Sequence, residues 1–343
     1  MPLASERGQV KAPSVTSSPG TPHEHPKAHE RPLRALGLRL LAMVMLSTMF
    51  MLIKYAGQHG VSMPELLFWR QAMSIPLIFA WLVASGSLGV LRTRRMASHA
   101  GRAATGTLGL MCNIAAATLL PLPVQTTLGF TTPLFAVLIT ALILRGKIGP
   151  WRWAAVVLGF VGVLIVTSPG SEPIPPLGLA IGLGAGVVVA TVSFQIRDLA
   201  RTEAPISCVF WFAVYGSAFA ALLMPLYARP HTNEAWLILF GVGLSGTLAQ
   251  FLITVSLRFG QVATVVIMDY TALIWATLYG WLIWDDLPPH RIWLGAPLII
   301  GAGLVITWRE HFLSKRISPT SALDVGLLEE AADERARIES KGT

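Results

Sequence analysis

The amino-acid sequence predicts an all-α membrane protein with about ten transmembrane helices in two inverted five-helix repeats. Two observations predict this fold. Apolar stretches of bilayer-spanning length recur along the whole chain, and its second half matches its first half at one offset. The composition agrees, because 53% of the 343 residues are hydrophobic and only 13% are charged. That balance is expected of a chain whose solvent is mostly lipid.

The apolar stretches each have roughly 18 to 24 residues and, as helices, cross a hydrocarbon core of about 30 Å. They are residues 35–57, 65–87, 103–120, 124–144, 151–168, 176–196, 205–227, 235–257, 262–284 and 291–308. The connections are too short for a soluble domain, so the function is expected within or between the helices. Residues 1–33 are predicted to be a disordered cytoplasmic tail, and residues 309–343 a cytoplasmic C-terminal tail.

The positive charges predict the topology, because Lys and Arg in short loops stay on the cytoplasmic side. With the N-terminus inside, the external loops hold only Arg229 and Arg291. The cytoplasmic regions collect Arg31, Arg34, Arg39, Arg92, Arg94, Arg95, Arg102, Arg145, Lys147, Arg152, Arg197, Arg201, Arg258, Arg309, Lys315 and Arg316. We therefore expect a multi-pass protein of the cytoplasmic (inner) membrane, with both termini in the cytoplasm.

An internal duplication is indicated when the chain is shifted against itself by about 140 residues. Pro64 then meets Pro205, and Trp153 meets Trp293. The predicted repeats cover residues 35–168 and 176–308. Because each repeat has an odd number of helices, the two enter the membrane from opposite sides. Inverted repeats of this kind commonly form transporters that hold the solute between the halves.

Two segments carry a resemblance to a known family. The stretch PLFAVLITALILRGKIGPWRWAAVVLGFVGVLIV and its partner MDYTALIWATLYGWLIWDDLPPHRIWLGAPLIIGAGLVIT resemble the two copies of the ten-helix drug/metabolite transporter superfamily module, the EamA type. The likeness spans roughly residues 35–308. It implies a secondary transporter that moves a small organic metabolite by alternating access, either proton-coupled or by exchange. Members commonly end the fourth helix of each repeat in a Gly–Glu pair, where this chain has residues 145–146 and 285–286.

A third segment, KYAGQHGVSMPELLFWRQAMSIPL, resembles the branch that includes importers of riboflavin and S-adenosylmethionine. The residues themselves distinguish neither the solute nor the direction of transport. They leave open amino acids, riboflavin, S-adenosylmethionine or a drug as the solute. The expected partners are this solute and the lipid bilayer, and a homodimer is allowed for.

Two cations in the outward half are predicted to bind solute. Arg70 is a candidate anchor for a carboxylate, a phosphate or an electron-rich ring, because its guanidinium forms a bidentate fork and stacks on aromatics. The alternative for Arg70 is a structural ion pair with Glu65, five residues earlier. Lys54 is the second candidate, and its alternative is to extend its stem to the headgroup layer.

Asp269 is the candidate coupling residue, because it lies about two turns, roughly 10 Å, inside the ninth apolar stretch. A carboxyl group that gains and loses a proton at such a depth can couple protons to transport. The alternative is a hydrogen bond between helices. Tyr270, Trp69 and Trp211 are candidate aromatic surfaces for a flat solute, although Trp near the end of a span is most often an interface anchor.

Glycine and proline predict how the helices pack and bend. Gly178, Gly182 and Gly186 recur every four residues, which predicts a close approach of a neighbouring helix. Pro76 and Pro133 lie inside predicted spans, as Pro297 also does, and are candidate kinks or hinges.

The main alternative from another class is a multi-span membrane enzyme acting on a lipid-phase substrate. Such an enzyme needs clustered His or paired carboxylates near one membrane face. The eight His residues are scattered through tails, loops and span ends, without HxxxH or HExxH spacing. Cys112 and Cys208 show no metal-ligand spacing. We therefore expect no catalytic residues, no metal and no cofactor. Nucleic-acid binding is disfavoured, because the cations form no aromatic-interleaved basic domain.

Overall fold

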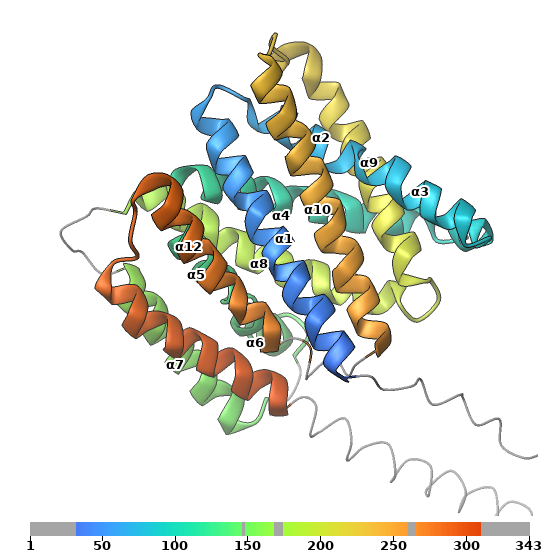
Figure 1. Cartoon of the computed structure of the whole chain (residues 1–343). Coiled ribbons are helices and arrows are strands. Elements are labelled where there is room, and N and C mark those ends of the chain that lie inside the picture. The colour runs from blue at the N-terminus through green and yellow to red at the C-terminus, as the bar shows by residue number, and fades with distance from the viewer. Residues whose placement is uncertain (1–31, 146–147, 168–173, 260–264, 266, 310–343) are drawn as a thin grey trace, which may run out of the picture.

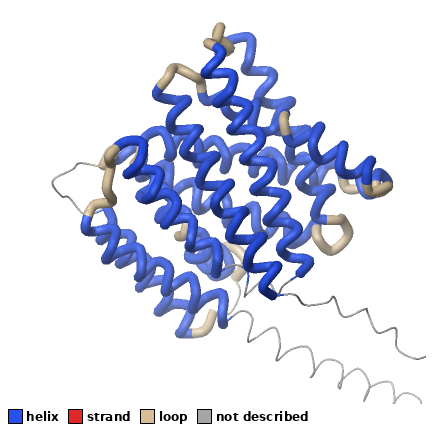
Figure 2. The backbone as a smooth tube through the Cα atoms, in the orientation of Figure 1, coloured by secondary structure: helices blue, strands red, loops and turns tan. Residues whose placement is uncertain are grey.

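The computed structural model describes residues 32–145, 148–167, 174–259, 265 and 267–309. Within these ranges the chain is helical, with two short 3-10 segments and no strand, and short loops join the helices (Figure 2). The predicted tails lie almost entirely outside the described residues. The membrane-protein fold class is confirmed, because eight helical segments are long and apolar enough to cross a bilayer and further helices complete about ten spans.

The described elements follow one another in a single bundle. They are α1 (Pro32–Gln58), α2 (Met63–Ala72), α3 (Ser74–Ala84), η1 (Leu88–Leu91), α4 (Met96–Leu119), α5 (Leu122–Gly129), α6 (Thr132–Leu142), α7 (Pro150–Thr167), α8 (Pro176–Leu199), α9 (Pro205–Tyr227), α10 (Asn233–Phe259), η2 (Ile267–Thr271), α12 (Ala272–Trp284) and a final helix, His290–Arg309. The pairs α2 with α3 and α5 with α6 each make one span.

The two broken spans are explained by proline. A proline ring clashes with the carbonyl four residues earlier and cannot donate a backbone hydrogen bond. Pro76 stands four residues after the last residue of α2, and Pro133 stands four residues after the last residue of α5. The kinks expected at these two positions are therefore present. The final helix, in contrast, continues through Pro297.

The third and ninth spans differ from the sequence prediction. The third was expected to begin at residue 103, but α4 begins at Met96 and includes buried His99 and Arg102. A hydropathy window stops at such charges, whereas the bundle gives Arg102 the face of the Phe212 ring. The ninth was expected as one helix over 262–284. Residues 260–264 and 266 lie outside the described ranges, and Asp269 lies in η2, before α12 begins.

The two halves of the chain, residues 32–167 and 174–309, are interlocked. The most extensive helix contacts join one half to the other: α1 lies along α10, α4 along α8, and α2 packs on α9 (Figure 1). Because α1 and α8 begin their halves and α4 and α10 are the third spans, the first two contacts are equivalent under exchange of the halves. Neither half therefore buries its helices without the other.

Glycines allow the closest helix contacts. A Cβ atom at Gly178 or Gly182 would lie 2.7 Å from a side-chain carbon of Leu120 or Leu128, and one at Gly186 would lie 2.8 Å from Thr131 Oγ1. The predicted glycine stripe thus packs α8 tightly on the α4–α5–α6 segment, as expected. Between α7 and the final helix the backbones themselves meet, since a Cβ atom at Gly162 would lie 2.8 Å from the carbonyl oxygen of Gly295.

The two ends of the bundle differ in which helix ends they contain. Figure 1 shows that α1 begins and the final helix ends at the same end, which we call the tail face. The opposite end, where α1 ends and α2 begins, is the far face. A chain that starts and finishes its described helices on one face crosses the bundle an even number of times.

Candidate functional site: a cavity between the halves

A cavity of about 310 Å³ lies between the two halves, and we call it the central cavity. It is lined by Arg39, Met43, Leu46, Ser47, Phe50, Asn113, Gln125, Thr126, Gly129, Phe130, Val189, Ile253, Asp269 and Ala272. These residues come from α1, α4, α5, α8, α10, η2 and α12. The volume is at the lower end of the range typical of small-molecule sites, about 300–1,000 Å³.

Residues separated by the repeat offset of 140 meet at this cavity. Gly129 and Asp269 both line it, and so do Asn113 and Ile253. Phe130 and its counterpart Tyr270 touch edge to face, with their ring centroids 5.0 Å apart. The cavity therefore lies where equivalent elements of the two halves converge. Its polarity is nevertheless unequal, because the carboxylate of Asp269 has only a glycine as its counterpart.

The cavity contains an ion pair between the halves. Arg39 on α1 donates from Nε to Asp269 Oδ1 at 2.5 Å and from Nη2 to Oδ2 at 2.6 Å. This bidentate geometry is the strong form of an Arg–carboxylate contact. The Arg39 side chain is 9% exposed and that of Asp269 is 29% exposed, so the carboxylate keeps access to the cavity. Asp269 thus has an interhelical partner and a path to solvent or solute.

A second group of polar atoms lies on α4 and α5. Asn113 donates from Nδ2 to the carbonyl of Gly109 at 2.9 Å, and Gln125 donates from Nε2 to Asn113 Oδ1 at 3.4 Å. The amides hold each other in place, while Thr126 lies within 3.5 Å of Gln125 Oε1. Together with the Phe50 and Phe130 rings, they give the cavity both aromatic surface and neutral hydrogen-bonding groups.

Polar contacts follow the seam between α1 and the η2–α12 segment from end to end. Beyond the Arg39–Asp269 pair, Thr48 Oγ1 lies 2.8 Å from the Tyr279 hydroxyl. At the far face, Trp284 Nε1 donates to Gln58 Oε1 at 2.7 Å. The equivalent seam, between α8 and the α5–α6 segment, is instead packed by the glycine stripe. One seam is thus held by polar contacts and the other by close packing of the α8 glycines against side chains.

Lys54, a predicted solute-binding residue, turns into the protein. Its side chain does not extend to the headgroup layer: it is 8% exposed and donates from Nζ to the carbonyl of Leu120 at 3.2 Å. The ammonium group also lies 5.0 Å from the centroid of a Trp284 ring. Lys54 therefore joins α1 to the α4–α5 corner and to α12, at the far-face end of the seam.

Arg70 is buried as well, but Glu65 is not its partner. Glu65 accepts hydrogen bonds from the backbone of Ser62 at 2.9 Å and of Arg229 at 3.1 Å, and its Oε1 lies 2.7 Å from His231 Nε2. These contacts cap α2 and tie it to the α9–α10 connection. The structural alternative for Arg70, a pair with Glu65, is therefore wrong. Arg70 contacts Gln71 and Phe212 instead.

The predicted aromatic surfaces do not meet at one place. Trp69 packs edge to face on Trp236 at 5.3 Å, whereas Trp211 donates to the carbonyl of Leu91 at 3.2 Å. Neither they nor Arg70 are among the residues that line the central cavity. Tyr270 lies beside that cavity through its contact with Phe130. The roles assigned to these four residues in solute binding remain predictions.

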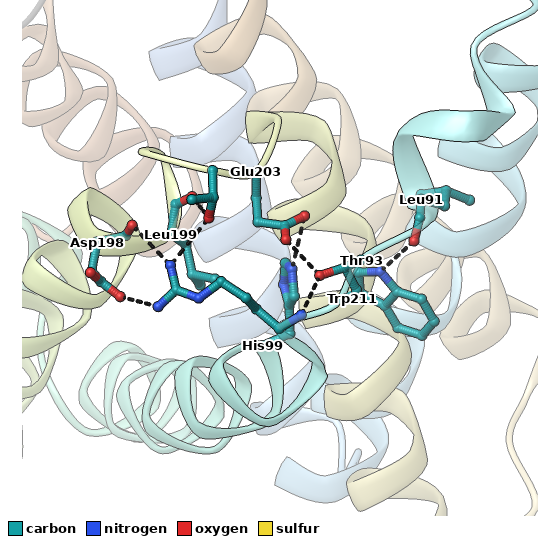
Figure 3. A network of polar contacts seen from close by, with 9 residues as sticks. Leu91, Thr93, His99, Asp198, Leu199, Glu203 and Trp211 are labelled. Atoms are coloured by element: carbon teal, nitrogen blue, oxygen red, sulfur yellow. Dashed lines mark hydrogen bonds and ion pairs between the residues drawn. The ribbon is translucent and has the colours of Figure 1, made fainter.

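A polar network closes the tail face (Figure 3). Arg95 donates from Nη2 to Asp198 Oδ2 at 2.5 Å, and Thr93 donates to Glu203 Oε1 at 2.6 Å. His99 Nε2 lies 3.6 Å from Glu203 Oε2. The network joins the first turn of α4 and the residues just before it to the end of α8 and the α8–α9 connection. Polar contacts between the halves are therefore present at both ends of the bundle.

Sequence reasoning missed two of these residues for one reason. Arg39 and Arg102 were counted with the flanking cations that set topology. Both lie inside helices, and both side chains point into the bundle. For Arg39 a signal was available, because Asp269 is an acid in an apolar span and needs a basic partner. For Arg102 the small residues that follow it, including Gly106, could have indicated that the helix begins earlier.

Comparison with known proteins assigns the family. The profile of the EamA-like transporter family matches residues 33–168 and 176–308. A riboflavin transporter of Vibrio cholerae serotype O1 is 30% identical over 77% of this chain and 89% of its own length. A pseudopaline exporter of Pseudomonas aeruginosa is 26% identical over 79% of this chain and 94% of its own.

Two further similarities agree. An S-adenosylmethionine uptake transporter of Rickettsia bellii is 26% identical over 82% of this chain and 96% of its own length. A solved crystal structure has the same fold, with a TM-score of 0.57 and 20% identity over 81% of this chain and 98% of that one. The family profile matches the chain twice, and the two matches together cover nearly all of the described helices. The chain therefore belongs to the EamA-like transporter family, and it is a multi-pass membrane transporter of small molecules and not an enzyme.

Proposed function

We propose that this protein is a secondary transporter of the cytoplasmic (inner) membrane that moves a flat, uncharged heterocyclic metabolite, with riboflavin as the first candidate. In this proposal the two halves are inverted repeats, both termini are cytoplasmic, and the solute binds in the central cavity. The observation that carries the proposal is the convergence of equivalent residues from the two halves on one cavity with an ion pair in its wall. Inverted-repeat transporters bind their solutes at such a position.

The choice of solute rests on the chemistry of the cavity. Riboflavin has a planar ring system with an imide edge and a chain of hydroxyl groups. The Phe50 and Phe130 rings suit the planar part. Asn113 and Gln125 have amide groups that can both donate and accept hydrogen bonds. Because Arg39 and Asp269 neutralise each other, the cavity favours a solute without net charge. The 30% identical relative is named a riboflavin transporter.

The coupling mechanism is assigned to the Arg39–Asp269 pair. When a proton neutralises Asp269, the bidentate pair with Arg39 loses its charge attraction and its second hydrogen bond. The polar seam between α1 and α12 then weakens at the tail-face end, whereas the glycine-packed seam does not change. Proton binding would thereby favour one of the two conformations, which is the requirement for coupled alternating access.

Gating is assigned to the polar contacts at the two ends. At the tail face, opening must separate Arg95 from Asp198 and Thr93 from Glu203. At the far face, it must separate Lys54 and Gln58 of α1 from Trp284 of α12. Each set joins the two halves, so the halves cannot separate at one face without breaking that set.

The test is riboflavin transport by purified protein reconstituted in liposomes. The wild-type protein is expected to accumulate riboflavin when a pH gradient is imposed, and S-adenosylmethionine is expected to compete poorly. Asp269→Asn should abolish accumulation while retaining exchange of riboflavin across the membrane, because the variant can still bind solute but cannot exchange a proton. Asp269→Glu should keep part of the coupling.

The matched control is Asp285→Asn, the same chemical change at the other end of the same span and outside the cavity. It should accumulate riboflavin normally. Accumulation by Asp269→Asn with an unchanged response to the pH gradient would remove Asp269 from the mechanism. Transport of S-adenosylmethionine or an amino acid without transport of riboflavin would contradict the choice of solute.

A further inference from the structure

We propose that Arg70 and Arg102 together bind a small anion inside the helix bundle, at a site distinct from the central cavity. The anion is either an inorganic ion such as chloride or nitrate, or the anionic group of a solute. Arg70 comes from α2 and Arg102 from α4. This proposal does not depend on which solute the protein transports.

The two guanidinium groups share one aromatic ring. The Cζ atom of Arg102 lies 4.1 Å from the centroid of the Phe212 ring, and that of Arg70 lies 5.7 Å from it. Arg70 is 8% exposed and Arg102 is 7% exposed. The ring face attracts a cation but has no net charge. Two positive charges are thus buried near each other, and within the part of the chain that the structure describes neither one pairs with a carboxylate.

Three guanidinium nitrogens have no acceptor. Arg70 Nε and both Nε and Nη1 of Arg102 are buried and lack a hydrogen-bond partner among the described residues. Across the same residues, neither arginine forms an ion pair. A buried charge without a partner is strongly unfavourable, and buried hydrogen-bond donors are nearly always satisfied. Both deficits are removed by one acceptor that carries a negative charge.

Several of the neighbouring polar groups already have partners of their own. Arg70 Nη1 donates to Gln71 Oε1, and Gln71 Nε2 donates to the carbonyl of Phe212 at 3.2 Å. Ser74 and Thr247 hydroxyls lie 2.8 Å from each other. Glu203, in the α8–α9 connection, accepts from Thr93 and faces His99. The arginines are therefore held in position by their neighbours but not neutralised by them.

Glycines keep other side chains away from the pair. A Cβ atom at Gly106 would lie 2.9 Å from the Phe212 ring and 3.4 Å from Arg102 Nη1, and one at Gly246 would lie 3.3 Å from Arg70 Cγ. On α4 the spacing from Arg102 through Gly106 to Asn113 follows one face of the helix. Asn113 lines the central cavity, so the anion site lies on the same face about 16 Å away along α4.

The experiment is thermal unfolding of the purified full chain in nitrate, chloride or phosphate, each titrated against gluconate at constant ionic strength. A ligand that binds only the folded state stabilises it by RT ln(1 + [L]/Kd), so the unfolding temperature rises with the logarithm of the ligand concentration once this exceeds Kd. The wild-type protein should show a rise that grows with the logarithm of concentration in at least one of the three small anions, and none in gluconate. Arg102→Gln and Arg70→Gln should lose this response.

Two additional variants separate anion binding from a structural role. Arg102→Lys keeps the charge but loses the fork, and should need at least about tenfold more anion for the same shift. In gluconate alone, Arg102→Gln should be at least as stable as the wild-type protein, because it removes an unneutralised charge. A merely structural arginine would instead make Arg102→Gln less stable in every salt.

The matched control is Arg95→Gln, which changes an arginine that is already paired with Asp198 on the tail face. It should retain the full anion response. The proposal is overturned if the wild-type protein unfolds at one temperature in all four salts, or if Arg102→Gln responds like the wild type. It is also overturned if Arg102→Gln is destabilised equally in all salts.

The source of the anion is resolved in a final arm with riboflavin 5′-phosphate and riboflavin as competitors. If only the phosphorylated compound raises the concentration of nitrate or chloride needed for the shift, the site binds the anionic group of a solute. If neither compound does, the site holds a free inorganic ion. The anion-binding result stands in both cases, and it does not depend on whether riboflavin is transported.

Discussion

At the residue scale, the arginines of this protein differ in how their charge is satisfied. Arg39 pairs with a carboxylate through two hydrogen bonds, and Arg95 pairs with a carboxylate at the protein surface. Arg70 and Arg102 lie over an aromatic ring and have no carboxylate partner among the described residues. The consequence is a difference in expected mutational effect. Removal of an arginine that neutralises an acid leaves a charge behind, whereas removal of an unneutralised arginine takes one away.

The first prediction concerns Arg39 and Asp269. Arg39→Gln should lower the free energy of unfolding by about 1–3 kcal/mol, because a partly buried carboxylate loses its charged partner. The double variant Arg39→Gln with Asp269→Asn should recover part of this loss, since neither group then carries a charge. Unfolding of the four proteins in one detergent gives the coupling energy as a double-mutant cycle. Additive effects of the two changes would show that the pair contributes nothing to stability.

The second prediction concerns the amides of the central cavity. Gln125→Ala should raise the KM for the transported solute about 2- to 10-fold, the effect of losing one hydrogen bond of roughly 0.5–1.5 kcal/mol. The control is Gln195→Ala. It removes an amide on α8 that donates to Thr105 on α4, outside the central cavity. That variant should leave KM unchanged. Equal effects of both variants on transport would argue against the cavity as the solute site.

At the element scale, the backbone conformation at helix ends and the packing between helices predict how substitutions change stability. Two residues near helix ends have left-handed backbone conformations: φ is 49° at Arg145, three residues after the end of α6, and 51° at Asp285, the C-cap of α12. They are separated by the repeat offset of 140, so the same backbone conformation recurs after the fourth span of each half. Both residues therefore adopt a conformation that glycine would adopt without a Cβ penalty.

The third prediction follows from this geometry. Arg145→Gly should raise the free energy of unfolding by up to about 1 kcal/mol, because glycine adopts positive φ without a Cβ penalty. Asp285→Gly should give a smaller gain, since Asp tolerates this conformation better. Arg145→Ala serves as the control and should give no gain. A gain from alanine equal to that from glycine would assign the effect to loss of the arginine side chain.

The fourth prediction concerns the contact between α7 and the final helix. Gly162→Ala should destabilise the protein by about 1–3 kcal/mol, because the new methyl group meets a backbone carbonyl that cannot rotate away. Gly301→Ala on the final helix has open space around the new Cβ and should be neutral or slightly stabilising. The comparison is made by thermal unfolding in the same detergent. Equal stability of the two variants would contradict the packing described.

At the scale of the whole molecule, the sequence predicted the helical class and the family well, because span length and apolarity are properties of the chain alone. It singled out Asp269 as an acid in an apolar segment, and this residue lines the central cavity, while its role in coupling stays a prediction. It did not identify Arg39 as the partner, since a cation near the start of a span has the same appearance whether it points to headgroups or into the bundle. Lys54 illustrates the same ambiguity, because its inward direction is decided by Leu120 and Trp284.

The fifth prediction tests the topology. On a background with Cys112→Ala and Cys208→Ala, a cysteine introduced at position 172 should react with an impermeant reagent in intact cells. A cysteine at position 94, expected on the cytoplasmic side, should react only after lysis. The reason is the excess of Arg and Lys in the loops assigned to the cytoplasm. The reverse labelling pattern would show that the protein has the opposite orientation in the membrane.

The interlocking of the halves has a consequence for biogenesis. When the ribosome has delivered only the first half, α1 lacks α10, α4 lacks α8, and Arg102 has not yet met Phe212 of α9. The newly inserted helices must then persist in the lipid without their final neighbours, with Arg70 and Arg102 still free to associate with headgroups or water. Assembly is therefore post-insertional, and the second half completes the first as a partner chain would. Two separately expressed halves meet the same requirement, and we expect them to reconstitute transport when produced together.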